Sequence, residues 1–171
     1  GLTVDAEESE RLDISLDIIE VVFSDPELGD WEGFGLAVQA YQKRAIHVIE
    51  WLRVLTQTVG RRMMVRLVKG AYWDSEIKHT QQMGLDEFPV FTRKSSTDVS
   101  YHACANKLLD YRDTIFPQFA THNAYTASVI IELAGGDSIK RNEAGFEFQC
   151  LHGMGDSLYD QVVREVGIQC R

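Results

Sequence analysis

Short apolar runs and longer amphipathic stretches alternate along the whole chain. The apolar runs have the length and composition of strands and fall at residues 2–5, 35–40, 63–68, 116–121 and 146–151. The stretches between them repeat apolar residues every three or four positions, which predicts helices at 8–23, 42–58, 73–83, 124–134 and 157–166, with another after residue 98. In the helix after residue 98 we expect the inner face, or its border, to contain Val99, Ala103, Asn106 or Lys107, and Leu109. Strands that each precede a helix indicate parallel βαβ units.

The number of strands bears on the architecture. A closed (β/α)8 barrel needs eight strand–helix units, whereas five are predicted here. The chain is therefore either a complete open sheet or part of a barrel. Its first residues, Gly1 to Val4, already lie in a strand pattern without an initiator methionine. This abrupt start favours part of a barrel.

Composition narrows the class of protein. With 171 residues, 44% of them hydrophobic, the chain can form one domain with a sizeable core. A net charge of −9 argues against nucleic-acid binding, and no apolar run is long enough to cross a bilayer. Cys104, Cys150 and Cys170 are an odd number without paired spacing, which favours free thiols in a reducing compartment. The histidines and cysteines show no metal-ligand spacing, and no glycine-rich dinucleotide fingerprint follows a strand.

Polar residues gather where the predicted strands end. Both barrels and open parallel sheets build their functional sites at the carboxyl ends of the strands, so these side chains are expected to face one rim. In chain order they are Asp5, Glu7, Glu8, Gln39, Tyr41, Arg66, Lys69, Thr121, His122, Asn123, Gln149 and His152.

Arg66 lies inside the apolar run 63–68, and Lys69 directly follows it. A buried cation is costly unless an anion or a hydrogen-bonding group meets it. Either an anionic or strongly polar ligand binds there, or Arg66 forms an internal ion pair with Asp5. The two interpretations are not exclusive.

A cationic, hydroxyl-rich cluster spans residues 93–97 and leads into the helix after residue 98. Backbone amides at a helix start, together with Arg93 and Lys94, suit a phosphate or pyrophosphate. The alternative is an ordinary helix start, in which a serine or threonine caps the helix and Asp98 lies in its first turn. Sequence alone does not separate the two, because anion sites reuse the capping geometry.

Two other features carry weaker signals. Tyr72 and Trp73, in the turn after the third strand, could stack on a flat ring, although aromatic residues in such turns more often serve packing. His122 could bind a ligand or be a structural histidine with satisfied hydrogen bonds.

Long blocks of the sequence resemble the proline dehydrogenase domain of bacterial PutA-type flavoproteins. The most specific are RLVKGAYWDSEIK at 66–78, FPVFTRK at 88–94, PQFATHN at 117–123 and FEFQCLHGMG at 146–155. Further matches are TVDAEE at 3–8, YQKR at 41–44 and TDVSY at 97–101, all in the family's order. The resemblance implies part of a distorted (β/α)8 TIM-like barrel, about strands 3–7 with their helices, as a single incomplete segment over residues 1–171.

The resemblance also implies a reaction. Members of this family bind FAD without a covalent link and oxidise L-proline to Δ1-pyrroline-5-carboxylate, and the electrons pass to a membrane quinone. Arg66 resembles the arginine beside the reactive edge of the flavin, where it would stabilise negative charge on the reduced cofactor. Asp5 would hold the arginines of the pocket in place by ion pairing, and Tyr72 would act beside them.

Other positions match the family's binding residues. The resemblance implies that FAD contacts Gln39, Arg66, Val68, Lys69, Gly70, Ala71, Trp73, Thr92, Arg93, Lys94, Thr121, His122, Asn123 and Gln149. It implies that the proline pocket is lined by Asp5, Tyr72 and Leu151. No metal site is implied.

The family further implies a longer chain with an aldehyde dehydrogenase half, a cytoplasmic protein that associates with the membrane surface when active, and possible homo-oligomers. Its first two strands and its eighth strand would lie outside residues 1–171, so we expect this segment alone to have little or no activity. Two alternatives remain at this stage. One is an open-sheet module that binds a nucleotide or flavin without oxidising proline; the other is a non-catalytic piece that makes subunit contacts.

Overall fold

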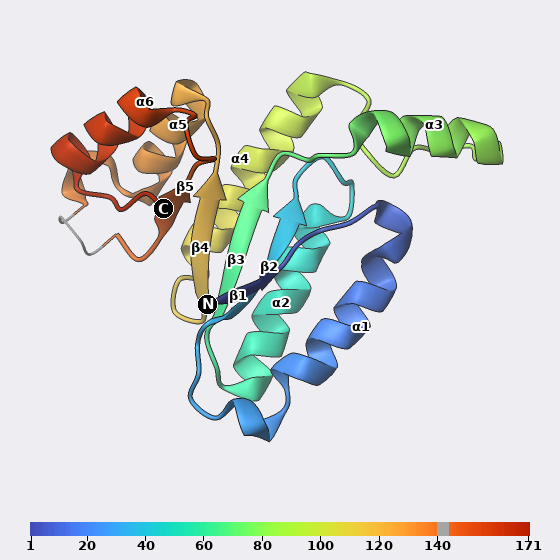
Figure 1. Ribbon diagram of the computed structural model, residues 1–171, viewed down its shortest axis with the longest axis horizontal. Helices are drawn as coiled ribbons and strands as arrows, with labels where there is room; N and C mark the ends of the chain where they lie inside the picture. Colours follow the sequence, from blue (N-terminus) through green and yellow to red (C-terminus); the bar gives the residue numbers. More distant parts are fainter. Residues whose placement is uncertain (140–143) are drawn as a thin grey trace.

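Five parallel strands form a single sheet in the computed structural model, which describes residues 1–139 and 144–171 (Figure 1). The strands are β1 (Leu2–Val4), β2 (Phe34–Gln39), β3 (Met63–Val68), β4 (Ile115–Ala120) and β5 (Glu147–Gln149). Each pairs with the next in the chain, so the spatial order is β1-β2-β3-β4-β5. All five predicted strands are present, and β3 has the predicted bounds.

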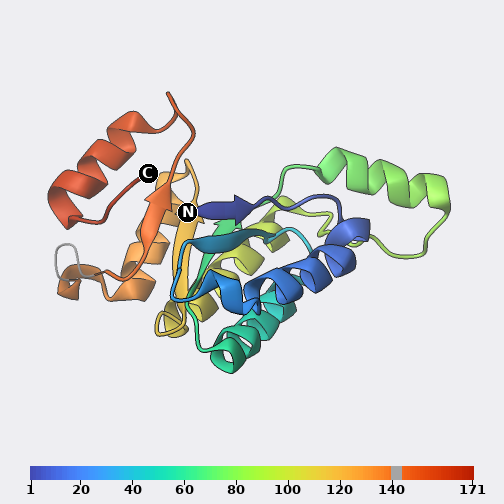
Figure 2. The ribbon, with the colours of Figure 1, turned by 60° about the horizontal axis from the view of Figure 1, so that its bottom comes forward.

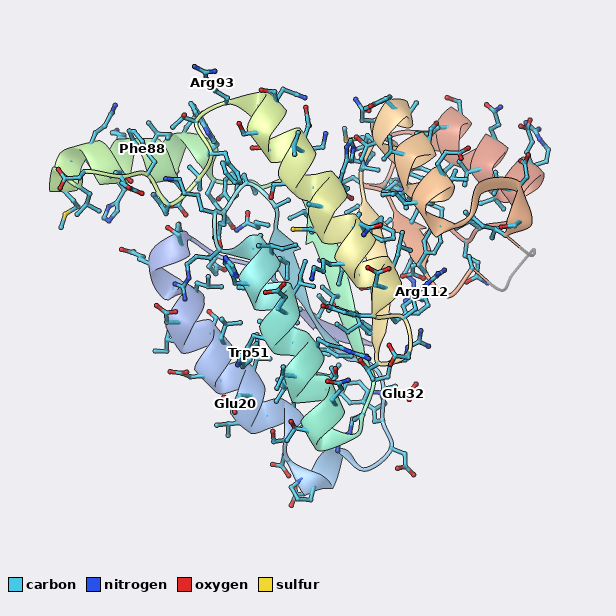
Figure 3. All side chains as sticks on the ribbon, turned by 180° about the vertical axis from the view of Figure 1, so that it is seen from behind. Glu20, Glu32, Trp51, Phe88, Arg93 and Arg112 are labelled. Atoms are coloured by element: carbon cyan, nitrogen blue, oxygen red, sulfur yellow. The ribbon has the colours of Figure 1, made fainter. Side chains whose placement is uncertain are left out.

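The sheet order decides between the two architectures left open by the sequence. An open doubly wound sheet reverses its strand order at a switch point, whereas these strands run consecutively. The helices α1 (Leu12–Phe23), α2 (Ala45–Val59), α4 (Lys94–Asp110) and α5 (Ala124–Ala134) all cover the same face of the sheet (Figure 3). Consecutive parallel strands with helices on one face are part of a (β/α) barrel, so the open-sheet alternative is wrong.

Burial along β3 identifies the two faces of the sheet. Met63, Val65 and Leu67 are fully buried against the helices, whereas Met64, Arg66 and Val68 are half-buried on the opposite face. The two-residue period of a strand produces this alternation. Arg66 therefore lies on the face that the helices leave open, where its charge does not disrupt the apolar core.

The helices follow the predicted patterns with one error. The expected apolar faces of α1 and α2 are confirmed, since Ile19, Phe23, Ile49 and Leu52 are all buried. In α4 the predicted inner face is correct at Leu109 but wrong at Val99, which is 68% exposed, and at Ala103, which is also exposed. The buried residues are Thr97, Tyr101, Cys104, Ala105, Leu108 and Leu109. The polar sequence of α4 gives almost no periodic signal, and its packing between α2 and α5 sets which side is inward.

Helix α3 (Trp73–Met83) has the predicted bounds and projects away from the sheet in two views (Figures 1 and 2). Near the end of the chain, α6 (Asp156–Gln161) continues as a π-helical turn over Val162–Val166. The chain then returns to β5, where Cys170 pairs in parallel with Phe148. No helix among the described residues combines the length and apolar composition needed to cross a membrane.

Candidate active site at the carboxyl ends of the strands

A cleft of about 1000 Å³ opens where the five strands end, at the upper end of the range of about 300–1000 Å³ typical for cofactor sites. The predicted clustering of polar strand ends is confirmed for eight residues, which line this one cleft: Asp5, Gln39, Arg66, Lys69, Thr121, His122, Asn123 and Gln149. It is wrong for Glu7, Glu8, Tyr41 and His152, which lie outside the lining. Among the predicted site residues, the lining contains Asp5, Gln39, Arg66, Val68, Lys69, Gly70, Ala71, Tyr72, Lys94, Thr121, His122, Asn123, Gln149 and Leu151.

Arg66 is held from both sides of the cleft. Its Nε donates to Oε1 of Gln149 on β5 at 2.8 Å, and its Nη1 donates to Oδ1 of Asp5, after β1, at 2.6 Å. The first and last strands therefore both reach the cation on the central strand. The expected ion pair with Asp5 is present. It leaves the exposed side of the guanidinium available to a further anionic or polar group.

Gln39 joins the two loops that border the cleft. Its Nε2 donates to the carbonyl of Glu7 at 2.9 Å, and its Oε1 accepts from the amide of Ala71 at 3.0 Å. The side chain is almost fully buried, and both ends of its amide have a backbone partner. It thereby fixes the turn after β3 against the segment after β1.

Backbone hydrogen bonds to Tyr41 hold the turn after β3. The amide of Tyr41 donates to the carbonyl of Lys69 at 2.7 Å, and its carbonyl accepts from the amide of Phe91 at 2.8 Å. Gln42 and Val90 form an antiparallel bridge beside it. Burial, with Glu76 and Glu8 nearby, raises the pKa of Tyr41 to about 12, so its phenol stays neutral. Tyr41 thus connects the turn at Gly70 to the segment that leads into α4.

Gly70 is required at this turn for two reasons. Its φ is +146°, and a Cβ there would lie 2.4 Å from the ring of Tyr41. We expect Gly70→Ala to lower the free energy of unfolding by about 1–3 kcal/mol, because strain and a steric clash add. Thermal unfolding of the purified variant measures this.

The matched control is Gly60→Ala at the end of α2. Gly60 has a φ of +72°, but no atom lies within 4 Å of an added Cβ. This variant therefore carries only the backbone cost, about 1 kcal/mol. Equal losses in the two variants would contradict the proposed contact between Gly70 and the Tyr41 ring.

Two lysines meet one carboxylate beside the cleft. Asp98 accepts hydrogen bonds from Nζ of Lys69 at 2.5 Å and from Nζ of Lys94 at 2.7 Å. The hydrogen bond from Lys69 has the largest effect and that from Lys94 the next, and both hold the pKa of the Asp98 carboxyl below its usual value. Two cations around one anion leave a net positive charge at this edge of the cleft.

The start of α4 differs from the capping alternative. The helix begins at Lys94 rather than after residue 98, and its N-cap is Arg93, which forms no side-chain cap hydrogen bond. Neither a serine nor a threonine caps the helix, so that alternative is wrong. A helix start without a side-chain cap leaves amides of its first turn available to an anion.

The lowered pKa of Asp98 also predicts that the stability of the fold depends on pH. Because its folded pKa is depressed, its contribution is fully present above the unfolded pKa of about 4 and is lost as pH falls through the folded value. We expect Asp98→Asn to be less stable than the parent at pH 7, by about 1 kcal/mol or less. This gap should close near pH 2. Urea unfolding at pH 7 and pH 2 measures the difference in stability between the parent and Asp98→Asn. A difference of equal size at both pH values would contradict the prediction. In a Lys69→Met background, the same difference at pH 7 should be smaller.

Three predicted cofactor residues lie beyond the cleft lining. Trp73 donates from Nε1 to the carbonyl of Phe91 at 2.9 Å, which places its ring along the approach to α4. Thr92 and Arg93 are exposed at the start of α4, and Arg93 is at the outer end of that helix (Figure 3). Their roles stay predictions.

The residues after β4 have structural partners of their own. Oδ1 of Asn123 accepts from the amide of Thr126 at 2.9 Å and caps α5. Nε2 of His122 accepts from the amide of Leu151 at 3.0 Å, and the carbonyl of Thr121 accepts from the hydroxyl of Tyr159. His122 therefore makes one structural hydrogen bond and also lines the cleft, so its two interpretations stay predictions. The same contact brings Leu151 to the cleft.

The cleft also contains residues that were not predicted. Ala6, Ala37 and Ala120 line its walls, together with Cys150 and Arg171. Ala37 could have been found from the sequence, because it lies two residues before Gln39 on the same face of its strand. Arg171 could not, since it arrives through the return of the chain to β5.

Comparison with known proteins places the chain in a family. A family model described as proline dehydrogenase matches residues 1–171. The chain is 55% identical over 166 residues to bifunctional protein PutA of Klebsiella aerogenes and 52% identical over 163 residues to that of Rhizobium meliloti, covering 97% and 95% of this chain. It spans only 12% and 13% of the length of those relatives.

Solved structures agree with the sequence comparison. A mutant of proline utilization A (PutA) from Bradyrhizobium japonicum superposes with a TM-score of 0.92 at 56% identity, over 99% of this chain and 17% of that one. PutA from Bdellovibrio bacteriovorus inactivated by N-propargylglycine superposes with a TM-score of 0.91 at 32% identity, over the same shares. The sequence, the sheet order and the strand-end cleft thus agree, and the chain belongs to the proline dehydrogenase family.

Proposed function

We propose that this chain forms the flavin and proline site of a longer PutA-type protein, which oxidises L-proline to Δ1-pyrroline-5-carboxylate with FAD and passes the electrons to a membrane quinone. The observation that carries the proposal is the placement of Arg66. It is a cation on the face of the sheet that the helices leave open, fixed by Asp5 and Gln149 inside the cleft. Because the chain belongs to the proline dehydrogenase family, we propose that this cation lies beside the reactive edge of the flavin.

The residues of the cleft fit FAD. The group carries a flat ring system and an anionic pyrophosphate, and the cleft offers matching features. Backbone from Val68 to Ala71 lines one wall, and Lys69 and Lys94 supply positive charge. The uncapped start of α4 adds backbone donors of the kind that bind phosphates. Gln39, Thr121, His122, Asn123 and Gln149 would complete the contacts.

The chain's own residues would orient the reactants. When bound, FAD supplies the acceptor for a hydride taken from the ring carbon next to the proline nitrogen. Arg66 would offer preorganised positive charge where negative charge develops on hydride transfer. Asp5 holds this guanidinium in place, and Tyr72 and Leu151 would border the proline ring at the mouth of the cleft.

A complete barrel has eight strands, so we propose that three more come from elsewhere in the longer protein. The same protein would carry an aldehyde dehydrogenase half, as the family resemblance implies, and the relatives are named bifunctional. We further propose a cytoplasmic protein that approaches the membrane surface to reduce quinone, with homo-oligomers possible through the parent chain. The 171-residue segment alone would have little activity, because other strands complete the proline pocket.

Expression of the longer protein tests the proposal. The expected result is a yellow protein whose flavin absorption bleaches when proline is added without oxygen, and recovers with a soluble quinone. A colourless protein that gains no absorption with added FAD would favour the non-catalytic alternative. A yellow protein that proline does not bleach would retain the cofactor proposal and overturn the substrate.

A further inference from the structure

A second carboxylate, in the same cross-strand row as Arg66, is buried on the face of the sheet that the helices leave open. Glu147, on β5, is only 2% exposed, which is rare for an acidic residue without partners. Its Oε1 accepts from Nε2 of Gln118 at 2.8 Å and from Nε2 of Gln149 at 3.0 Å. Its Oε2 forms an ion pair with Nη2 of Arg171 at 3.3 Å. Glu147 does not line the cleft itself.

A chain of hydrogen bonds runs in one direction on this face: Arg66 donates to Gln149, and Gln149 donates to Glu147. An arginine Nε can only donate, and a carboxylate can only accept. Gln149 lies between them, so its amide nitrogen must face Glu147 and its amide oxygen must face Arg66. Arg66 and Glu147 share a cross-strand row through Gln118, two strands apart. The two residues are thus about 10 Å apart, too far for a direct hydrogen bond, and Gln149 is the residue that hydrogen-bonds to both.

We propose that Glu147 is a positioning residue for Arg66: it fixes the orientation of the Gln149 amide and thereby holds the guanidinium in its place in the cleft. The inference rests on the proposed function of Arg66 in flavin binding and proline oxidation. Asp5 alone does not fix the guanidinium, because it contacts Nη1 and is 74% exposed, leaving Nε to Gln149.

Glu147→Gln is the variant that tests this. It keeps the volume of the side chain but introduces a group that both donates and accepts, so the Gln149 amide can turn over and present a donor to Arg66. In the longer holoenzyme, at saturating proline and without oxygen, we expect flavin bleaching to be about 10-fold slower. The proline concentration that gives half-maximal bleaching should change by less than about twofold.

A second readout needs no turnover. Apoprotein is titrated with FAD, and the dissociation constant is read from flavin fluorescence. We expect E147Q to weaken FAD binding several-fold in the parent protein and to leave it unchanged when Arg66→Lys is already present. This non-additivity separates action through Arg66 from a general loss of structure.

The matched control is Glu76→Gln. Glu76 is also buried, at 3% exposed, and accepts from the amide and hydroxyl of Ser9, both at 2.6 Å, away from the cleft lining. E76Q should show equal effects with and without R66K. If E147Q fails to fold, Glu147→Asp, which shortens the reach to Gln149 by one methylene, is measured in the same cycle.

These experiments test the positioning role of Glu147 separately from the proposed oxidation of proline. Additive effects of E147Q and R66K on both readouts, or no effect of E147Q at all, would overturn the positioning role. A parent protein that binds FAD but is not bleached by proline would overturn the substrate assignment, while the FAD titrations still decide the role of Glu147.

Discussion

Arg66→Met in the longer protein is expected to slow flavin bleaching by proline about 10²- to 10³-fold, the loss typical when one preorganised charge partner is removed from a reaction site. Methionine preserves much of the side-chain length without the charge, so Asp5 and Gln149 lose their common partner. Stopped-flow absorbance of the flavin measures the rate.

Arg62→Met provides the control on the same segment. Arg62 lies just before β3, where its guanidinium packs 5.1 Å above the ring of Phe116 and donates to the carbonyl of Arg112 at 3.0 Å. This variant should keep the parent's bleaching rate. A similar loss in the two variants would mean that Arg66 matters for general stability and not for the chemistry at the cleft.

Phe119→Ala should have the largest effect on folding, with a loss of about 3–5 kcal/mol in the free energy of unfolding. Phe119 is fully buried on β4, and its ring packs 5.4 Å from that of Phe146 and 6.4 Å from that of Phe148. Truncation leaves a cavity at the centre of this aromatic cluster. Urea unfolding, followed by circular dichroism, measures the loss.

Val99→Ala is the corresponding surface control. Val99 is 68% exposed on α4, so its truncation removes little buried area and should change stability by no more than about 0.5 kcal/mol. A small effect of Phe119→Ala, close to that of Val99→Ala, would show that the aromatic cluster contributes little to the core.

The sequence predicts the strands better than the helix faces, for a physical reason. The apolar run of β3 and its flanking charges can be recognised locally, and Arg66 was therefore placed correctly on a core strand. Helix α4 has a mixed sequence, and its orientation depends on α2 and α5, which are distant in the chain. Local periodicity could not supply that information.

The same distinction applies to the cleft. Positions at strand ends, such as Asp5 and Gln149, could be predicted because parallel strands bring their carboxyl ends together. The orientation of the Gln149 amide could not, since it depends on Glu147 and on hydrogen bonds that only the folded chain forms. The first turn of α4 was also mispredicted, because Ser95, Ser96 and Thr97 resemble caps but lie inside the helix.

The antiparallel bridge between Gln42 and Val90 has a consequence for motion. Three backbone hydrogen bonds lie beside it: the amide of Tyr41 donates to the carbonyl of Lys69, the amide of Phe91 to the carbonyl of Tyr41, and the amide of Lys43 to the carbonyl of Pro89. Together they tie the long connection after α3 to the turn after β3. Amides on both sides of this junction should exchange with deuterium at similar rates, as one cooperative unit. The rim of the cleft would then open and close as a single piece, so a ligand held by either segment would slow exchange in both.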